Sequence, residues 1–135
     1  MKIKFAVLIT AVIALGSLAS RGISEQDRDE AAPVVIKTVP AAGAKDVPAG
    51  EYEIRITFSK EMKNESWSWC PAWENSNPEP LGGAYFEPGH RTCVLKVKLK
   101  PGTKYGWWIN NETYRGFRDA KNRPAVPYLF VFQTK

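Results

Sequence analysis

Three stretches of the chain alternate apolar and polar residues with a period of two, and this pattern restricts the fold more than any other feature. In residues 52–58 one side carries Tyr, Ile, Ile and Phe, and the other carries Glu, Arg and Thr. Residues 92–100 and 104–110 alternate in the same way. Successive side chains of a strand point to opposite faces, so each stretch predicts a half-buried β-strand.

Shorter strands are expected at residues 33–39, 66–70 and 128–134, between segments rich in turn residues. The chain has 10 Gly and 10 Pro among its 135 residues, which favours many turns over long helices. No convincing helical period follows residue 20. We therefore predict an all-β fold, an immunoglobulin-like antiparallel β-sandwich of about seven strands.

The N-terminal segment has the pattern of a signal peptide. A basic start is followed by an apolar run and by small residues at Ser17 and Ala19, which predicts cleavage before Ser20. The expected organisation is a signal peptide at 1–19, a flexible leader at 20–32 and the sandwich at 33–135. The mature protein is then secreted, periplasmic or cell-surface associated, with no membrane insertion after cleavage.

The charge pattern gives little support to a nucleic-acid partner. The formal net charge is +5, and two lysines in the signal peptide supply part of it, leaving +3 on the mature chain. The remaining bases are interspersed with acids rather than clustered into a patch.

Residues for catalysis or for metal binding are sparse. His90 is the one histidine of the chain, and no nucleophile motif accompanies it. A zinc site needs four suitable ligands, which one His and two dispersed Cys do not supply. We expect no enzymatic activity, no catalytic residues, no metal and no cofactor.

The five tryptophans are the candidates for a binding role. Trp107 shares a strand face with Tyr105 and is expected in the core, so its neighbour Trp108 must face outward. Leu129 is expected beside Trp108 if the last two strands are adjacent. An apolar outer patch of this kind usually binds or is covered by something. The candidate binding residues are Trp67, Trp69, Trp73, Trp108 and Tyr114.

The segment 66–70 leaves two alternatives open, because Trp67 and Trp69 lie on one face of the expected strand and Cys70 on the other. If Cys70 points inward, it can form a disulfide with inward-facing Cys93, and both tryptophans face outward. If the tryptophans fill the core, Cys70 faces outward and no bridge forms. The need of a small sandwich for large apolar side chains favours a core position for at least one of the tryptophans.

Four segments, in order, resemble a known family: "TVPAAGAKDVPAG", "ITFSKEM", "LKPGTKYGWWIN" and "FRDAKNRPAVPYLFVFQT". They are similar to the SbsA-type bacterial Ig-like domain over residues 33–135. The resemblance implies a secreted or surface-associated module without catalytic residues, acting as a spacer, stabiliser or binding domain. The additional tryptophans favour a role in interactions with an extracellular protein. The alternatives are a carbohydrate-binding module, which would stack sugars on exposed rings, and a homodimer that covers the Trp108 patch.

Overall fold

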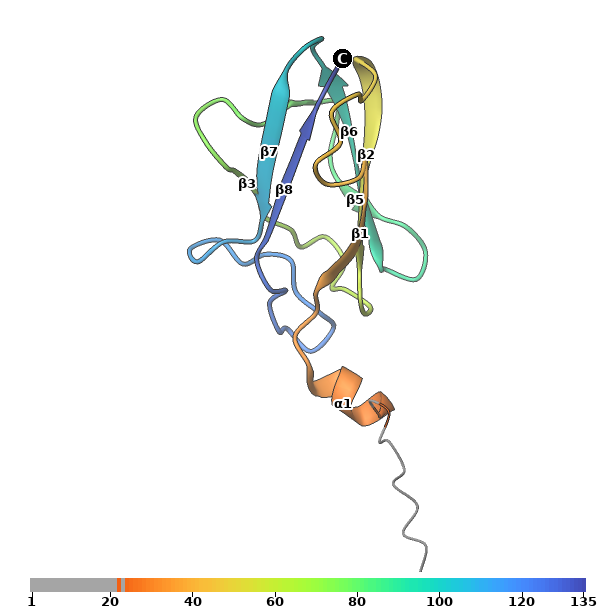
Figure 1. Cartoon of the computed structure of the whole chain (residues 1–135). Coiled ribbons are helices and arrows are strands. Elements are labelled where there is room, and N and C mark those ends of the chain that lie inside the picture. Colours follow the sequence, from red (N-terminus) through yellow and green to blue (C-terminus); the bar gives the residue numbers. More distant parts are fainter. Residues whose placement is uncertain (1–21, 23) are drawn as a thin grey trace, which may run out of the picture.

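The computed structural model describes residues 22 and 24–135 of the chain, which form one short helix and eight strands (Figure 1). The expected signal peptide at 1–19 lies outside the described residues. In chain order the elements are α1 (Glu25–Glu30), β1 (Val35–Val39), β2 (Gly50–Phe58), β3 (Trp69–Pro71), β4 (Glu79–Pro80), β5 (Tyr85–Phe86), β6 (Thr92–Leu99), β7 (Lys104–Ile109) and β8 (Tyr128–Gln133). The one described helix is too short to cross a membrane.

The strands form two antiparallel sheets that pack face to face. The larger sheet has five strands in the order β1-β2-β6-β4, with β5 also paired to β6, and the smaller has the order β3-β7-β8. Figure 1 shows the two layers side by side, with α1 below one end and the C-terminus at the other. The predicted β-sandwich is therefore confirmed.

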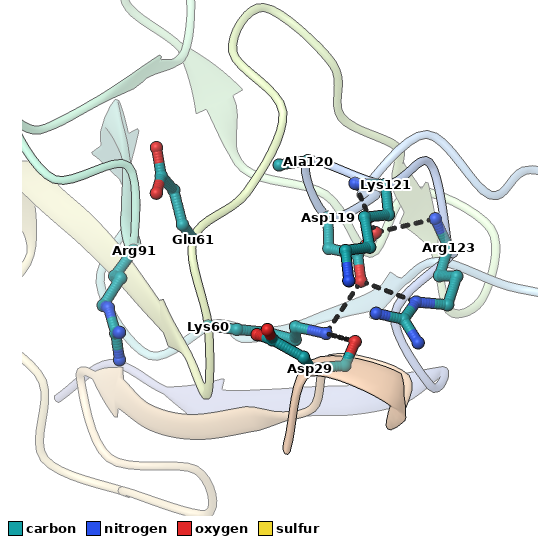
Figure 2. A pocket seen from close by; sticks show the side chains of 8 residues that line it. All are labelled: Asp29, Lys60, Glu61, Arg91, Asp119, Ala120, Lys121 and Arg123. Atoms are coloured by element: carbon teal, nitrogen blue, oxygen red, sulfur yellow. Dashed lines mark hydrogen bonds and ion pairs between the residues drawn. The ribbon is translucent and has the colours of Figure 1, made fainter. Parts of the chain in front are cut away.

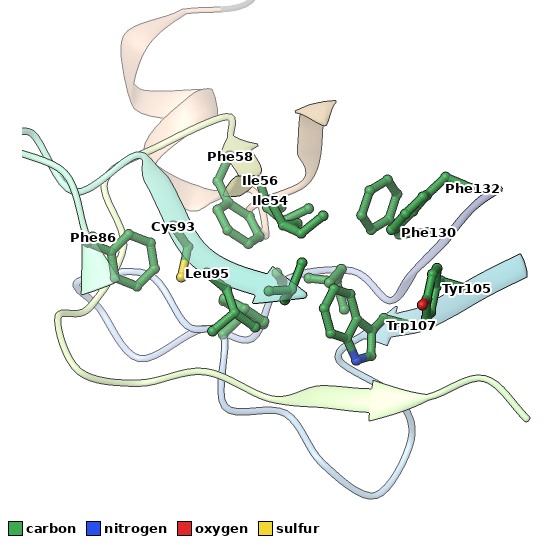
Figure 3. Close-up of a cluster of buried hydrophobic side chains, with 14 of the residues drawn as sticks. Ile54, Ile56, Phe58, Phe86, Cys93, Leu95, Tyr105, Trp107, Phe130 and Phe132 are labelled. Carbon is green, nitrogen blue, oxygen red and sulfur yellow. The ribbon is translucent and has the colours of Figure 1, made fainter. Parts of the chain in front are cut away.

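The alternating residues of the long strands build the core between the sheets. Every second residue of β2 from Ile54 to Phe58 is fully buried, and Trp107 of β7 is 3% exposed. Figure 3 shows Ile54, Ile56 and Phe58 of β2 facing the side chains of the other layer, which include Trp107 of β7 and Phe130 and Phe132 of β8. The period of two thus placed the core side chains correctly, because one face of each sheet is covered by the other sheet.

Two short strands, β4 and β5, pair with β6 beyond the strands expected from the sequence. Each has two residues, so neither leaves a measurable alternation in the sequence. The pairing of Tyr85 with Val94 explains one further difference. The alternation of residues 92–100 puts Val94 on the same face as Lys96, Lys98 and Lys100, which predicts an exposed side chain, yet Val94 is fully buried.

The interval predicted as a flexible leader contains α1, and this is a correction to the sequence analysis. Ser24 and Asp27 form a capping box, in which each side chain bonds the backbone N–H of the other. The end of the helix is held by Lys60, whose Nζ donates to the carbonyl oxygens of Asp29 (2.9 Å) and Ala31 (3.0 Å). A capping box needs only four residues, so it stabilises a helix too short to show a period.

The connection from β7 to β8 is organised by one fully buried side chain, Asn110. Its Nδ2 donates to the carbonyl oxygens of Phe117 (2.9 Å) and Ala125 (3.1 Å), and its Oδ1 accepts from the Phe117 N–H (2.9 Å). Its backbone has a φ of 59°, a conformation that asparagine tolerates better than most residues. Asn110 therefore supplies hydrogen-bond partners to loop backbone that water does not reach.

Candidate interaction surface

The outer face of the β3-β7-β8 sheet carries a row of apolar side chains that crosses all three strands. Cys70 of β3 lies opposite Trp108 of β7, and Trp108 lies opposite Leu129 of β8. Trp108 is half-buried and Leu129 is 46% exposed. These positions confirm that Trp108 faces outward and that Leu129 lies beside it, as the strand alternation predicts.

Trp73 extends this row because its indole lies over Gly106 of β7. A Cβ atom at position 106 would overlap the Trp73 ring, so glycine is needed for this close approach. The ring remains 41% exposed, and the ammonium of Lys104 lies 5.9 Å from its centroid. Trp73 therefore packs on the sheet with one side and faces solvent with the other.

A buried serine holds the turn that presents Trp73. The Oγ of Ser76 accepts from the N–H groups of Ala72 (2.9 Å) and Trp73 (3.1 Å) and donates to the Gly106 carbonyl (2.7 Å). Ser76 is fully buried. Neither Ser76 nor Gly106 was predicted from the sequence, because a single serine or glycine carries no local signal of a contact with a distant segment.

Tyr114 lies beside the row on the loop that follows β7, and its side chain is 64% exposed. The loop is shaped by Asn111, whose Oδ1 accepts from the N–H groups of Thr113 (2.9 Å) and Tyr114 (2.6 Å). A hollow of about 450 Å³ separates Tyr114 from β3, and Cys70 lies in its wall. We call Trp73, Trp108, Tyr114 and Leu129 the outer aromatic surface.

Trp67 and Trp69 do not belong to this surface, although both were candidate binding residues. Trp69 packs edge-on against Trp107, with ring centroids 4.9 Å apart, and the Trp67 ring lies 6.4 Å from that of Phe86. Both tryptophans are half-buried and contact the core. Of the two alternatives for this segment, the structure therefore adopts the one in which the tryptophans point inward.

The disulfide between Cys70 and Cys93 is not formed, which corrects the other alternative. Both cysteines are free and buried, Cys70 on the outer face of its sheet and Cys93 between the sheets. Strand alternation explains this, since Trp69 occupies the inner face and Cys70 must then point the other way.

A family model described as Bacterial Ig-like domain matches residues 29–134. The chain belongs to this family. No curated protein and no solved structure gave a significant match to the chain. Bacterial Ig-like domains of this family usually occur in surface or extracellular proteins and are generally non-enzymatic modules.

Among the described residues of this bacterial Ig-like domain, the two thiols and the His90 imidazole have surroundings of the following kind. Burial raises the pKa of the Cys70 thiol, and it raises the pKa of Cys93 to about 12. Both thiols are therefore protonated at neutral pH, where a nucleophile would need to be a thiolate. His90 is 40% exposed, and its Nδ1 lies 3.9 Å from a Glu61 oxygen. That distance exceeds a hydrogen bond.

A cluster of charged side chains surrounds Asp119, at the end of the sandwich near α1 (Figure 2). The carboxylate of Asp119 is 1% exposed and accepts from Lys60 Nζ (3.0 Å) and Arg123 Nε (3.1 Å). Its other oxygen accepts from the backbone N–H groups of Lys121 (3.0 Å) and Arg123 (2.8 Å). Asp119 is thus engaged in holding its own turn and Lys60.

The pKa of Asp119 reflects these contacts. Burial alone would raise the pKa of this carboxyl group, but the hydrogen bonds from the Arg123 backbone and from Lys60 outweigh it. The pKa is therefore held below its ordinary value. A carboxylate that stays ionised and accepts hydrogen bonds on both oxygens stabilises the fold and is poorly suited to transferring a proton.

Substitution Trp69→Phe should cost little stability, because the Nε1–H of Trp69 is buried without a hydrogen-bond partner. Phenylalanine keeps a ring against Trp107 and removes the unpaired donor, which offsets the lost volume. We expect a change within about 1.5 kcal/mol, against a loss of roughly 2–4 kcal/mol for Trp69→Ala. Urea unfolding of the two variants measures this, and equal losses would contradict an unpaired N–H.

Proposed function

We propose that this domain is an exported, non-catalytic interaction module that binds another envelope or extracellular protein through the outer aromatic surface. The proposal includes the signal peptide at 1–19 and the SbsA-type subclass, which rest on the sequence pattern and on the ordered motifs. The observation that carries it is the gathering of partly exposed Trp73, Trp108 and Leu129 on one sheet face.

Exposed apolar side chains lower the solubility of a protein, and contiguous apolar patches on a surface usually mark interaction sites. The same residues would be unnecessary in a spacer. Aromatic side chains in particular bury a large area on binding with little loss of conformational entropy, which makes them frequent binding hot spots. Lys104 and Arg115 lie next to the surface in sequence and supply a polar margin.

A glycan ligand is a less favoured alternative. Stacking on a polysaccharide would use a row of exposed rings, and the inward packing of Trp67 and Trp69 removes two members of that row. Of the five candidate rings, Trp73 and Tyr114 remain well exposed. A protein partner, by contrast, can also use the aliphatic side chain of Leu129.

The test introduces a photo-crosslinking amino acid at position 114 in bacterial cells and compares Leu129→Lys with a matched control. The control is Ile36→Lys, since Ile36 is 61% exposed on β1 of the other sheet. We expect Leu129→Lys to lower the yield of a discrete cross-linked protein at least tenfold, the effect of a loss of about 1.4 kcal/mol. Ile36→Lys should leave the yield unchanged.

Other results would contradict the proposal in distinct ways. Equal yields in the two variants would show that the outer aromatic surface is not the contact. A dimer in light scattering that Leu129→Lys abolishes would show that a second copy covers the surface. Binding to cell-wall polysaccharide that requires Tyr114 but survives Leu129→Lys would favour the glycan alternative.

A further inference from the structure

β3 is the edge strand of the smaller sheet: β7 pairs with one of its sides, and no strand of the described residues pairs with the other. Figure 1 shows β3 at the outer margin, beside β7. An edge strand presents backbone N–H and C=O groups that can pair with another chain. The structure therefore leaves a short length of sheet edge available.

The pairing with β7 identifies which backbone groups face the free side. Asn110 N donates to Ser68 O, and Ala72 N donates to Gly106 O, both at 3.2 Å. Because hydrogen bonding alternates along a strand, residues 68, 70 and 72 bond toward β7. The N–H and C=O of Trp69 and the C=O of Pro71 then point toward the free edge.

Two hollows flank this edge, and Trp69 and Pro71 line both of them. The outer hollow, of about 450 Å³, is completed by Cys70, Asn111 and Tyr114. The second, of about 300 Å³, opens between the two sheets. Its walls include Trp67, Pro78, Pro80, Ala84 and Trp107. The shared residues place the hollows on the two sides of one strand edge.

This arrangement matches the side-chain pattern of an added strand. An extended peptide bonds an edge through its backbone, and its successive side chains point to opposite faces. We infer that the β3 edge takes an extended segment of another protein as a fourth strand of the β3-β7-β8 sheet, with alternate side chains entering the two hollows. This inference rests on the proposed function, since it specifies how the partner protein is held.

The chemistry of the hollows defines the segment. The hollow between the sheets is walled by tryptophan and proline and takes an apolar side chain. The outer hollow combines the Tyr114 ring with the Asn111 amide and Ser68, and takes an aromatic or polar one. Pro71 has no N–H, so the added strand finds one donor and two acceptors and is limited to a few residues.

A second copy of this chain fits the edge less well than a foreign segment does. Its own β3 side chains, Trp69 and Cys70, are already packed on the two faces of its own sheet. They cannot also enter the hollows of a neighbour. A peptide segment without prior structure has both sets of side chains free.

The test selects peptides from a phage-displayed random dodecapeptide library on the purified protein and follows backbone amide hydrogen exchange by NMR. We expect the Trp69 amide to exchange at least tenfold more slowly when a selected peptide is bound. The Cys70 amide, already bonded to β7, should not change. Gly83→Leu should weaken peptide binding at least tenfold, because Gly83 lines the hollow between the sheets with open space around its Cα. Ala120→Leu, on the exposed Asp119 turn, is the matched control and should bind normally.

Three results would overturn the inference. The first is a selection that returns no binder, and the second is one that returns peptides shifting the Trp108 and Leu129 signals without slowing exchange at Trp69. In the second case the proposed function stands, because the outer face binds without the edge. In the third result, exchange of the Trp69 amide becomes slower as protein concentration rises without any peptide. This would show that the β3 edge pairs with a second copy of the chain. The effect of Leu129→Lys on cross-linking tests the proposed function separately, because Leu129 lines neither hollow.

Discussion

Substitution Asn110→Ala should be among the most destabilising single changes in this domain. It removes three hydrogen bonds to buried backbone and places alanine at a φ of 59°. At about 1 kcal/mol for each bond and about 1 kcal/mol for the left-handed backbone, we expect a loss of about 4 kcal/mol in the free energy of unfolding. The melting temperature should fall by about 15–30 °C. Calorimetry measures both changes.

Asn122→Ala is the control that separates the two causes. Asn122 has a φ of 66° and is exposed. No hydrogen bond of its side chain is found within the described residues, so this variant reports the backbone cost alone, about 1 kcal/mol. Similar losses in the two variants would contradict the role assigned to the Asn110 side chain.

Substitution Asp119→Ala should have the second large effect. It leaves Lys60 and Arg123 without their carboxylate and frees two backbone N–H groups of the turn. Removing one partner of a buried pair costs roughly 3–5 kcal/mol. Lys60 and Arg123 are 17% and 29% exposed, so water compensates in part and we expect about 3 kcal/mol. Glu51→Ala, which breaks an exposed pair with Lys96, is the control and should cost under about 1 kcal/mol.

The contribution of Asp119 should depend on pH in a defined direction. Its pKa in the folded protein is below its ordinary value, which is about 3.9 in the unfolded chain. The stabilisation is therefore complete above about pH 5 and is lost as the pH falls through the folded-state pKa. Denaturant unfolding between pH 7 and pH 3 should show the wild type and Asp119→Ala converging at low pH. A constant difference would show that the carboxylate charge is not involved.

The strands and the core could be predicted from the sequence because period-two alternation reports burial directly. Residues 52–58 and 104–110 show it over their whole length, so the inward positions of Ile54 and Trp107 follow without a structure. The outward position of Trp108 follows from the same parity. The alternation could not decide which face of the three-residue strand β3 is buried, because Trp69 on one face and Cys70 on the other are both apolar.

The remaining features depend on contacts between distant segments. Ser76 reaches Gly106 across 30 positions, and Lys60 reaches Asp119 across 59, so neither partner is visible in a local pattern. The hollows beside β3 are likewise formed by three separate loops. The sequence therefore indicated aromatic residues as candidates, but it could not separate those that build the sandwich from those that line its surface.

The attachment of α1 through Lys60 has a mechanical consequence. The same ammonium holds two carbonyl oxygens at the end of α1 and the Asp119 carboxylate. A pulling force on α1 would therefore load the contacts of this ammonium, and through the Lys60 backbone it would reach the end of β2 as well as the Asp119 turn. Lys60 thus joins α1 mechanically to two segments of the sandwich that are distant in sequence.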